Sequence, residues 1–117
     1  MTQFDENTIQ NLKYYVYMLT DTRNNKPFYI GKGFGNRVFD HLESVKSEKY
    51  KPNEKSNTIK EIIERGGTIG HMIIRHGLTE SEAFQIEASI IDTLKYCNYN
   101  LSNLVIGQNS IEKGLMK

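Results

Sequence analysis

The feature that most constrains the fold is the run KYYVYMLT over residues 13–20, which is rich in aromatic and β-branched residues and apolar at consecutive positions. Apolar side chains at consecutive positions are typical of a strand that is covered on both faces. The polar stretch that follows offers Asn24 and Asn25 as turn residues, and apolar character returns over residues 27–30, PFYI. Pro27 is acceptable at the first residue of a strand. The sequence therefore predicts a β-hairpin whose first strand is central in the sheet.

The segment after this hairpin is rich in glycine and predicts a loop that opens a helix. Residues 31–36 read GKGFGN, and Asn36 is a suitable N-cap. The apolar positions that follow have helical spacing: Val38, Leu42 and Val45. The polar segment over residues 47–57 contains Pro52, and it predicts a surface loop.

The chain then predicts a short helix and a third strand. The isoleucines at positions 59, 62 and 63 mark the helix, which ends at the glycine pair 66–67. Residues 68–75 follow as a strand. The Asn-rich end of the chain, from residue 98 onward, is poorly periodic, and a short helix is expected near Ile111.

A longer helix carries a carboxylate in an unusual place. Thr79 and Glu82 form a capping-box pattern, which predicts a helix that runs to about Lys95. The helical neighbours of Glu87 are apolar: Ala83, Phe84, Ile90, Ile91 and Leu94. Removing an ionised carboxylate from water is costly unless it is paired or bound to a metal. Glu87 is therefore either one half of a structural ion pair or a functional carboxylate.

Length and composition favour one domain without a membrane span. A chain of 117 residues is too short for a second core, and its 38% hydrophobic and 25% charged residues are ordinary for a globular protein. No run approaches the roughly 20 apolar residues of a membrane span, and the start of the chain lacks the pattern of an export signal. Cys97 is the only cysteine, so no internal disulfide can form. We expect a single domain over residues 1–117, located in the cytoplasm.

Positive charge gathers in the first half of the chain. Residues 1–60 hold ten basic and seven acidic side chains, a net +3, whereas residues 61–117 hold five and seven, a net −2. This asymmetry is compatible with a phosphate-bearing ligand.

Two cations stand near the glycine segment. Arg37 and His41 are four residues apart and share a helix face, from which both could reach an anion. The structural alternative is that Arg37 pairs with Asp40 and that His41 is a surface residue. His71 and His76 have no zinc-ligand spacing with Cys97, so a zinc site is not expected.

The glycine segment does not match a nucleotide-binding motif. The dinucleotide pattern needs glycine at position 36, where Asn36 stands, and the P-loop pattern is absent. A glycine-rich loop with Lys32 at a helix start can still cradle a phosphate, or it can be only a tight turn.

Taken in order, these residues resemble a known motif set. Residues 15–17 (YVY), residues 29–31 (YIG), Arg37, His41 and Glu87 resemble the ordered motifs of the GIY-YIG nuclease superfamily. That superfamily carries its two triplets on short strands about ten residues apart, followed by Arg, by His or Tyr, by Glu and by Asn. The first triplet departs from the family by having Tyr15 in place of glycine.

The C-terminal half extends the resemblance to about residues 13–107. The run GLTESEAFQIEASIIDTL and the later LSNLVIG resemble a bacterial branch related to animal LEM-domain nucleases. Asn103 fits the family's Leu-x-Asn pattern, whereas Asn100 resembles the Tyr-Asn pair of other branches. We predict Asn103 as the site residue.

The resemblance implies an α+β domain with a small three-stranded antiparallel sheet flanked by helices. It also implies an endonuclease that hydrolyses phosphodiester bonds, most plausibly in duplex or structured DNA, with one Mg²⁺ or Mn²⁺ ion. Glu87 would bind the ion as a hard oxygen ligand.

The resemblance also suggests roles for the remaining site residues. Tyr17 would orient or deprotonate the nucleophile beside Tyr29. Lys32, Arg37 and the metal would together favour the ionised form of Tyr17. Arg37 would also contact the scissile phosphate, and His41 would act as an acid or as a base. We expect Tyr17, Tyr29, Arg37 and Glu87 to converge on one concave surface, with Tyr17 and Glu87 on the same face of the sheet.

Substrate binding is expected to come mainly from basic residues in the first half of the chain. The candidates for contacts with phosphates are Lys32, Arg37, Lys46, Lys49, Lys51 and Lys55. Two other classes of function stay open. One is a nucleic-acid-binding module of the same fold that has lost turnover, and the other is a nucleotide-binding domain that uses the glycine segment.

Overall fold

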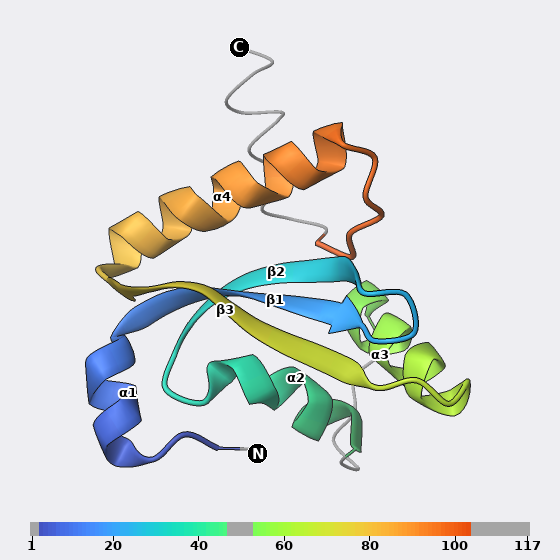
Figure 1. The fold of residues 1–117 in the computed structure, drawn as a ribbon, viewed down its shortest axis with the longest axis horizontal. Coiled ribbons are helices and arrows are strands. Elements are labelled where there is room, and N and C mark those ends of the chain that lie inside the picture. Colours follow the sequence, from blue (N-terminus) through green and yellow to red (C-terminus); the bar gives the residue numbers. More distant parts are fainter. Residues whose placement is uncertain (1–2, 47–52, 104–117) are drawn as a thin grey trace.

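The computed structural model of the protein describes residues 3–46 and 53–103. The chain forms an α+β fold in which helices flank one sheet (Figure 1). The elements in order are α1 (Glu6–Leu12), β1 (Tyr14–Asp21), β2 (Lys26–Phe34), α2 (Arg37–Lys46), α3 (Glu54–Glu64), β3 (Ile69–Leu78) and α4 (Glu80–Tyr96). In this part of the chain no helix is both long enough and apolar enough to cross a membrane.

The sheet has three antiparallel strands in the order β2-β1-β3, so the strand predicted to be central is central. The turn between β1 and β2 uses the predicted asparagines: the backbone N–H groups of Asn24 and Asn25 donate to the carbonyl of Asp21. Asn25 adopts a left-handed conformation with φ 58°, which asparagine tolerates well. The predicted hairpin and the predicted fold class are confirmed.

Both faces of β1 are covered, as its apolar run predicts. Tyr15, Tyr17 and Leu19 belong to a core shared with α1, α2 and α3, whereas Val16 and Met18 pack toward α4. Figure 1 shows the resulting layers, with α4 along one side of the sheet and the other three helices along the opposite side. Helices on opposite sides can therefore meet only around an edge of the sheet.

The glycine segment is not the predicted loop. Residues 31–34 continue β2, and only Gly35 and Asn36 separate this strand from α2. The reason is packing: a Cβ atom on Gly31 would stand 2.5 Å from the Cζ and hydroxyl oxygen atoms of Tyr17. Glycine is needed here for the close approach of a neighbouring ring rather than for a flexible loop.

Several boundaries also differ from the sequence prediction. Helix α1 was not predicted, because its seven residues contain only two apolar side chains, Ile9 and Leu12. None of its residues is fully buried. Helix α3 begins at Glu54, inside the predicted loop, because Asn53 and Ser56 form a reciprocal capping box. The predicted N-cap Asn36 accepts the N–H of Phe4 through its side-chain oxygen at 2.6 Å.

Farther along the chain, the capping box of Thr79 starts α4 as predicted. Strand β3 continues to Leu78, beyond its predicted end. The helix expected near Ile111 lies outside the described residues.

Candidate active site

The candidate site lies at the outer edge of β2. Because β2 is an edge strand, alternate backbone groups point away from β1 and are open to other partners. Asn103 takes one such position: its side-chain oxygen accepts the N–H of Ile30 at 3.0 Å, and its nitrogen donates to the Ile30 carbonyl at 2.6 Å. The next outward N–H, from Lys32, donates to Glu87. This edge therefore brings Asn103 and Glu87 against the YIG triplet.

Tyr17 reaches this edge from the opposite face of the sheet. Its register partner on β2 is Gly31, and its ring tip lies where a Gly31 side chain would stand. The Tyr17 ring lies 6.2 Å from the Tyr29 ring between centroids, and the two side chains share a hydrogen bond. The Tyr17 side chain thus lies on one face of the sheet, whereas Glu87 comes from α4, which covers the other face. The expectation of a common face is wrong. The two residues approach each other across the edge of β2, which Gly31 leaves bare.

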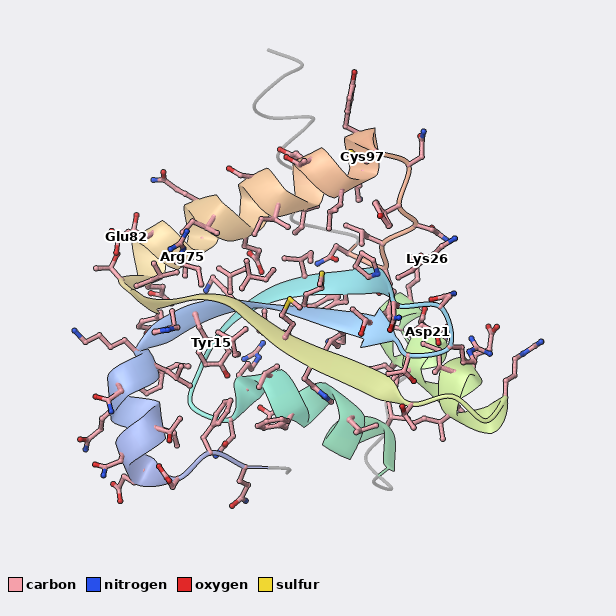
Figure 2. All side chains as sticks on the ribbon, in the orientation of Figure 1. Tyr15, Asp21, Lys26, Arg75, Glu82 and Cys97 are labelled. Carbon is pink, nitrogen blue, oxygen red and sulfur yellow. The ribbon has the colours of Figure 1, made fainter. Side chains whose placement is uncertain are left out.

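Tyr15 positions Arg37 at the start of α2. The Tyr15 hydroxyl donates to the Gly35 carbonyl at 2.6 Å and accepts the backbone N–H of Val38 at 3.1 Å. Arg37 stands between these two bonded residues, and a Cβ atom on Gly33 would lie 2.8 Å from the Arg37 Cβ. Figure 2 shows Tyr15 on the side of the sheet that faces α1 and α2. The residue that replaces the family's glycine therefore fixes the backbone on both sides of Arg37.

Glu87 is buried with unmet hydrogen-bonding capacity. It exposes 2% of its surface, and its Oε1 atom has no hydrogen-bond partner. Burial raises the pKa of Glu87 to about 7, although the positive charges of Lys32 and Arg37 and the backbone hydrogen bond from Lys32 oppose this shift. Among the side chains that the structure describes, ion pairs join Arg23 with Asp21, Lys32 with Glu80, and Arg65 with Glu61. None of them includes Glu87, so the alternative of a structural ion pair finds no support there.

A pocket of about 340 Å³ collects most of these groups. Its lining residues are Tyr14, Tyr29, Lys32, Gly33, Phe34, Arg37, Glu80 and Glu87. Of the four residues expected to converge, the pocket brings Tyr29, Arg37 and Glu87 together, and Lys32 joins them. Tyr17 lies behind Tyr29 and does not line the pocket.

Both tyrosines of the site retain their protons more strongly than a tyrosine in water. Burial raises the pKa of Tyr17 well above its ordinary value, and the charge of Arg37 offsets only part of that shift. Burial and the charge of Glu87 also raise the pKa of Tyr29. Desolvation thus outweighs the charge of Arg37 at Tyr17, and the expected contribution of the metal to its ionisation stays a prediction.

The other predicted residues are placed as follows. His41 and Lys46 belong to α2, and their side chains are not described; Lys49 and Lys51 lie outside the described residues. Lys55 is near the site, with its ammonium nitrogen 5.0 Å from the centroid of the Tyr29 ring. Asn100, the alternative to Asn103, lines a different pocket.

Sequence reasoning missed Glu80 as a lining residue. Its carboxylate lies 3.6 Å from the ammonium of Lys32. Glu80 and Glu87 are seven residues apart on α4, which is two helical turns and therefore one face. That spacing was the available signal.

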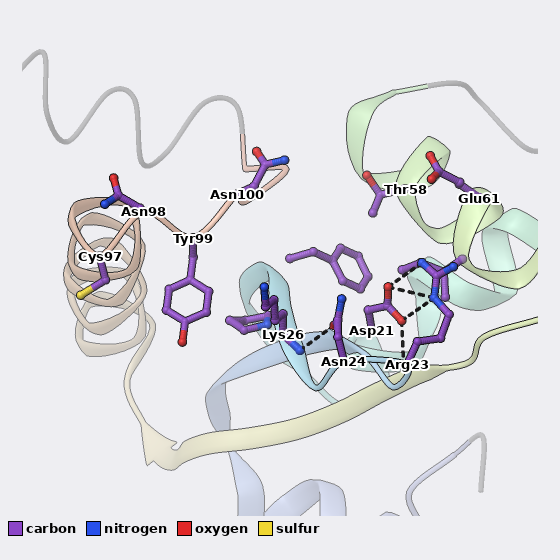
Figure 3. A pocket seen from close by; sticks show the side chains of 13 residues that line it. Asp21, Arg23, Asn24, Lys26, Thr58, Glu61, Cys97, Asn98, Tyr99 and Asn100 are labelled. Atoms are coloured by element: carbon purple, nitrogen blue, oxygen red, sulfur yellow. Dashed lines mark hydrogen bonds and ion pairs between the residues drawn. The ribbon is translucent and has the colours of Figure 1, made fainter. Parts of the chain in front are cut away.

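The second pocket, of about 620 Å³, lies between the β1–β2 turn, α3 and the end of α4 (Figure 3). Its buried carboxylate is already paired: Arg23 donates to both carboxylate oxygens of Asp21, at distances from 2.7 to 3.2 Å. Except for Asn100, no residue predicted to act in the site lines this hairpin pocket. We therefore take the smaller pocket as the candidate active site.

The chain forms a small α+β domain with a three-stranded antiparallel sheet flanked by helices, which is the fold that the resemblance to the GIY-YIG nucleases implies. Residues 5–114 match the family of LEM-3-like GIY-YIG domains, and the chain belongs to this family. GIY-YIG domains are generally nucleases that act on nucleic acids, so membership of the family indicates a function of the nuclease type.

A curated relative supports this assignment. The chain is 40% identical over 77 residues to the ankyrin repeat and LEM domain-containing protein 1 homolog of Caenorhabditis elegans. The match covers 61% of this chain and 11% of that relative, so the chain spans about a tenth of the relative's length. No solved structure matches the chain significantly.

Proposed function

We propose that the protein is a divalent-metal-dependent endonuclease that hydrolyses phosphodiester bonds in DNA. The observation that carries this proposal is the unpartnered, buried Oε1 atom of Glu87 in a pocket that also holds Arg37 and Tyr29. A buried carboxylate without a cationic partner is costly, and a bound cation would offset that cost.

The residues present fit one hard divalent cation such as Mg²⁺ or Mn²⁺. Glu87 would hold it through carboxylate oxygen. Among the described residues, no three His, Cys, Asp or Glu side chains lie close enough together to hold a metal ion. Magnesium sites with one or two carboxylates commonly complete their coordination with water and substrate phosphate. When bound, the ion would supply charge neutralisation and Lewis acidity at the scissile phosphate.

The chain's own groups would then bind and orient the substrate. Arg37 would hold non-bridging oxygens of the scissile phosphate, because its guanidinium is planar and can donate two hydrogen bonds. Lys32 lines the same pocket and would add positive charge, with Glu80 holding its ammonium in place.

Tyr29 takes the orienting role that the resemblance suggested for Tyr17. Tyr29 lines the pocket, whereas Tyr17 lies behind it and shares a hydrogen bond with it. The Tyr29 hydroxyl would contact the attacking water, and Tyr17 would fix the orientation of that hydroxyl. Asn103 would act through the backbone, because both ends of its amide are bonded to Ile30 beside Tyr29.

A cleavage assay tests this proposal. Labelled DNA duplex, branched DNA and RNA of the same sequence are incubated with the protein in Mg²⁺ or in EDTA, and the products are separated on a denaturing gel. We expect internal cleavage of DNA that requires the metal. Binding without cleavage would identify an inactive nucleic-acid-binding module instead, and cleavage of RNA alone would contradict the proposed substrate.

A further inference from the structure

Lys55 lies against an aromatic ring and is partly buried, unlike a surface lysine that extends into solvent. It lies in the first turn of α3, which packs on the sheet through Ile59 and Ile62. Its ammonium nitrogen stands over the ring of Tyr29, 5.0 Å from the centroid, and the residue is partly buried. A cation over an aromatic face is attracted by the ring electrons, so Tyr29 helps to hold Lys55 in place.

The charged group that acts most clearly on Lys55 is another cation. Burial lowers the pKa of Lys55, and the positive charge of Arg37 lowers it further. Neither Lys55 nor Arg37 takes part in an ion pair within residues 3–46 and 53–103. Lys55 is partly buried and Arg37 is exposed, but their like charges act on each other and repel. An anion bound between them would relieve that repulsion.

We propose that Lys55, beside Arg37, forms a second phosphate subsite, which holds the backbone phosphate next to the one that Arg37 contacts in the Tyr29 and Glu87 pocket. This inference rests on the proposed function, since it assumes a nucleic-acid strand in that pocket. Lys55 does not line the pocket and stands over the Tyr29 ring, so it addresses the neighbouring phosphate rather than the reacting one. Lys55 is thus a substrate-binding residue that sets the path of the strand across α3.

The first test measures the salt dependence of binding. The affinity for a labelled DNA duplex is measured by fluorescence anisotropy in EDTA, from 50 to 200 mM salt, for the wild type and for Lys55→Met, Lys55→Arg and Lys60→Met. Lys60 is the matched control, because it is an exposed lysine of the same helix. Loss of one phosphate contact should reduce the logarithmic salt slope by about 0.9, which is roughly a 3-fold change in affinity over this range.

We expect this reduction in Lys55→Met only, and a wild-type slope in Lys55→Arg and Lys60→Met. Equal slopes in the wild type and Lys55→Met would overturn the subsite, whether or not the protein cleaves DNA. Binding without cleavage by the wild type would instead contradict the proposed nuclease function alone, and the slopes would still decide the role of Lys55. Should Lys55→Met lower the unfolding temperature, Lys55→Gln replaces it.

The second test locates the phosphate. Duplexes that carry one uncharged methylphosphonate, placed one bond on either side of the mapped cleavage site, are cleaved in Mg²⁺. We expect the methylphosphonate on one side to raise the KM of the wild type several-fold while leaving the KM of Lys55→Met unchanged. The same sensitivity in both proteins at both positions would overturn the assignment of a neighbouring phosphate.

Discussion

Two pockets of this protein differ in whether a buried carboxylate is paired within the protein. The hairpin pocket is the larger, about 620 Å³ against about 340 Å³, and it contains a buried carboxylate, Asp21, that is paired with Arg23 through several hydrogen bonds. The candidate active site, here called the edge pocket because it lies at the edge of β2, contains a buried carboxylate, Glu87, with an unpartnered oxygen. The cation beside it, Arg37, is in none of the ion pairs among the described side chains.

This difference shows that size is a poor guide to the site. A charge pair that is complete within the protein stabilises a turn, and it has little left to offer a ligand. A buried carboxylate and a cation held apart are maintained against a cost in folding free energy. That cost is what marks the edge pocket as functional.

Substitution of either buried carboxylate by its amide should give the largest difference between the two pockets. Glu87→Gln should lower the cleavage rate by roughly 10³-fold, because it removes the charge that would hold the cation and keeps the side-chain volume. Asp21→Asn, the matched change in the hairpin pocket, should keep wild-type turnover and lower the unfolding temperature. Steady-state cleavage and thermal unfolding of both variants give the comparison, and wild-type turnover by Glu87→Gln would remove its proposed role.

Arg37 of the edge pocket and Arg23 of the hairpin pocket form a second matched pair. Arg37→Ala should reduce kcat/KM by about 10²-fold, through loss of contacts to the scissile phosphate. Arg23→Ala should leave kcat/KM unchanged and should destabilise the turn, since it leaves Asp21 buried without its partner. An equal loss of kcat/KM in the two variants would show that both pockets, or neither, contact the substrate.

Tyr15→Phe should have a smaller effect that depends on Arg37. The substitution removes the hydroxyl bonded to Gly35 and Val38, so we expect a loss of about tenfold in kcat and of about 1–2 kcal/mol in the free energy of unfolding. A double-mutant cycle separates positioning from stability. If Tyr15 acts by positioning Arg37, Tyr15→Phe lowers kcat in the wild type and has little further effect in Arg37→Ala.

The last effect does not involve turnover: it is on the pH dependence of stability without metal. The pKa of Glu87 is raised to about 7 in the folded protein from 4.5, so the folded state keeps a proton that the unfolded chain releases between these values. The contribution of Glu87 to stability should therefore fall as pH rises from about 4.5 to about 7. This loss, of order 2–3 kcal/mol, should be absent from Glu87→Gln. Urea unfolding in EDTA across this pH range measures it, and parallel stability curves for the two proteins would contradict the shift.

The parts of the fold that depend on local pattern could be predicted from the sequence. The apolar run around Tyr17 predicts a strand covered on both faces, and Thr79 with Glu82 predicts the start of α4. The role of Gly31 could not be predicted, because it depends on the ring of Tyr17 on the neighbouring strand. A glycine that serves a tertiary contact looks the same in sequence as one that serves a loop.

The candidate site shows the same division. The apolar neighbours of Glu87 make that carboxylate conspicuous in sequence, and the motif order adds Tyr29 and Arg37. The meeting of the two faces at the edge of β2 is a property of the whole sheet, as is the placement of Tyr29 in front of Tyr17. Lys55 comes from a helix whose approach to Tyr29 no local pattern encodes.

Metal binding by the free protein tests the central claim most directly. Mn²⁺ is titrated into the wild type, Glu87→Gln and Asp21→Asn without nucleic acid, and bound and free ion are resolved by electron paramagnetic resonance. We expect one bound Mn²⁺ ion per chain for the wild type and for Asp21→Asn, and loss of that ion in Glu87→Gln. Equal binding by Glu87→Gln and the wild type, or loss of the ion in Asp21→Asn, would contradict the assignment of the edge pocket as the metal site.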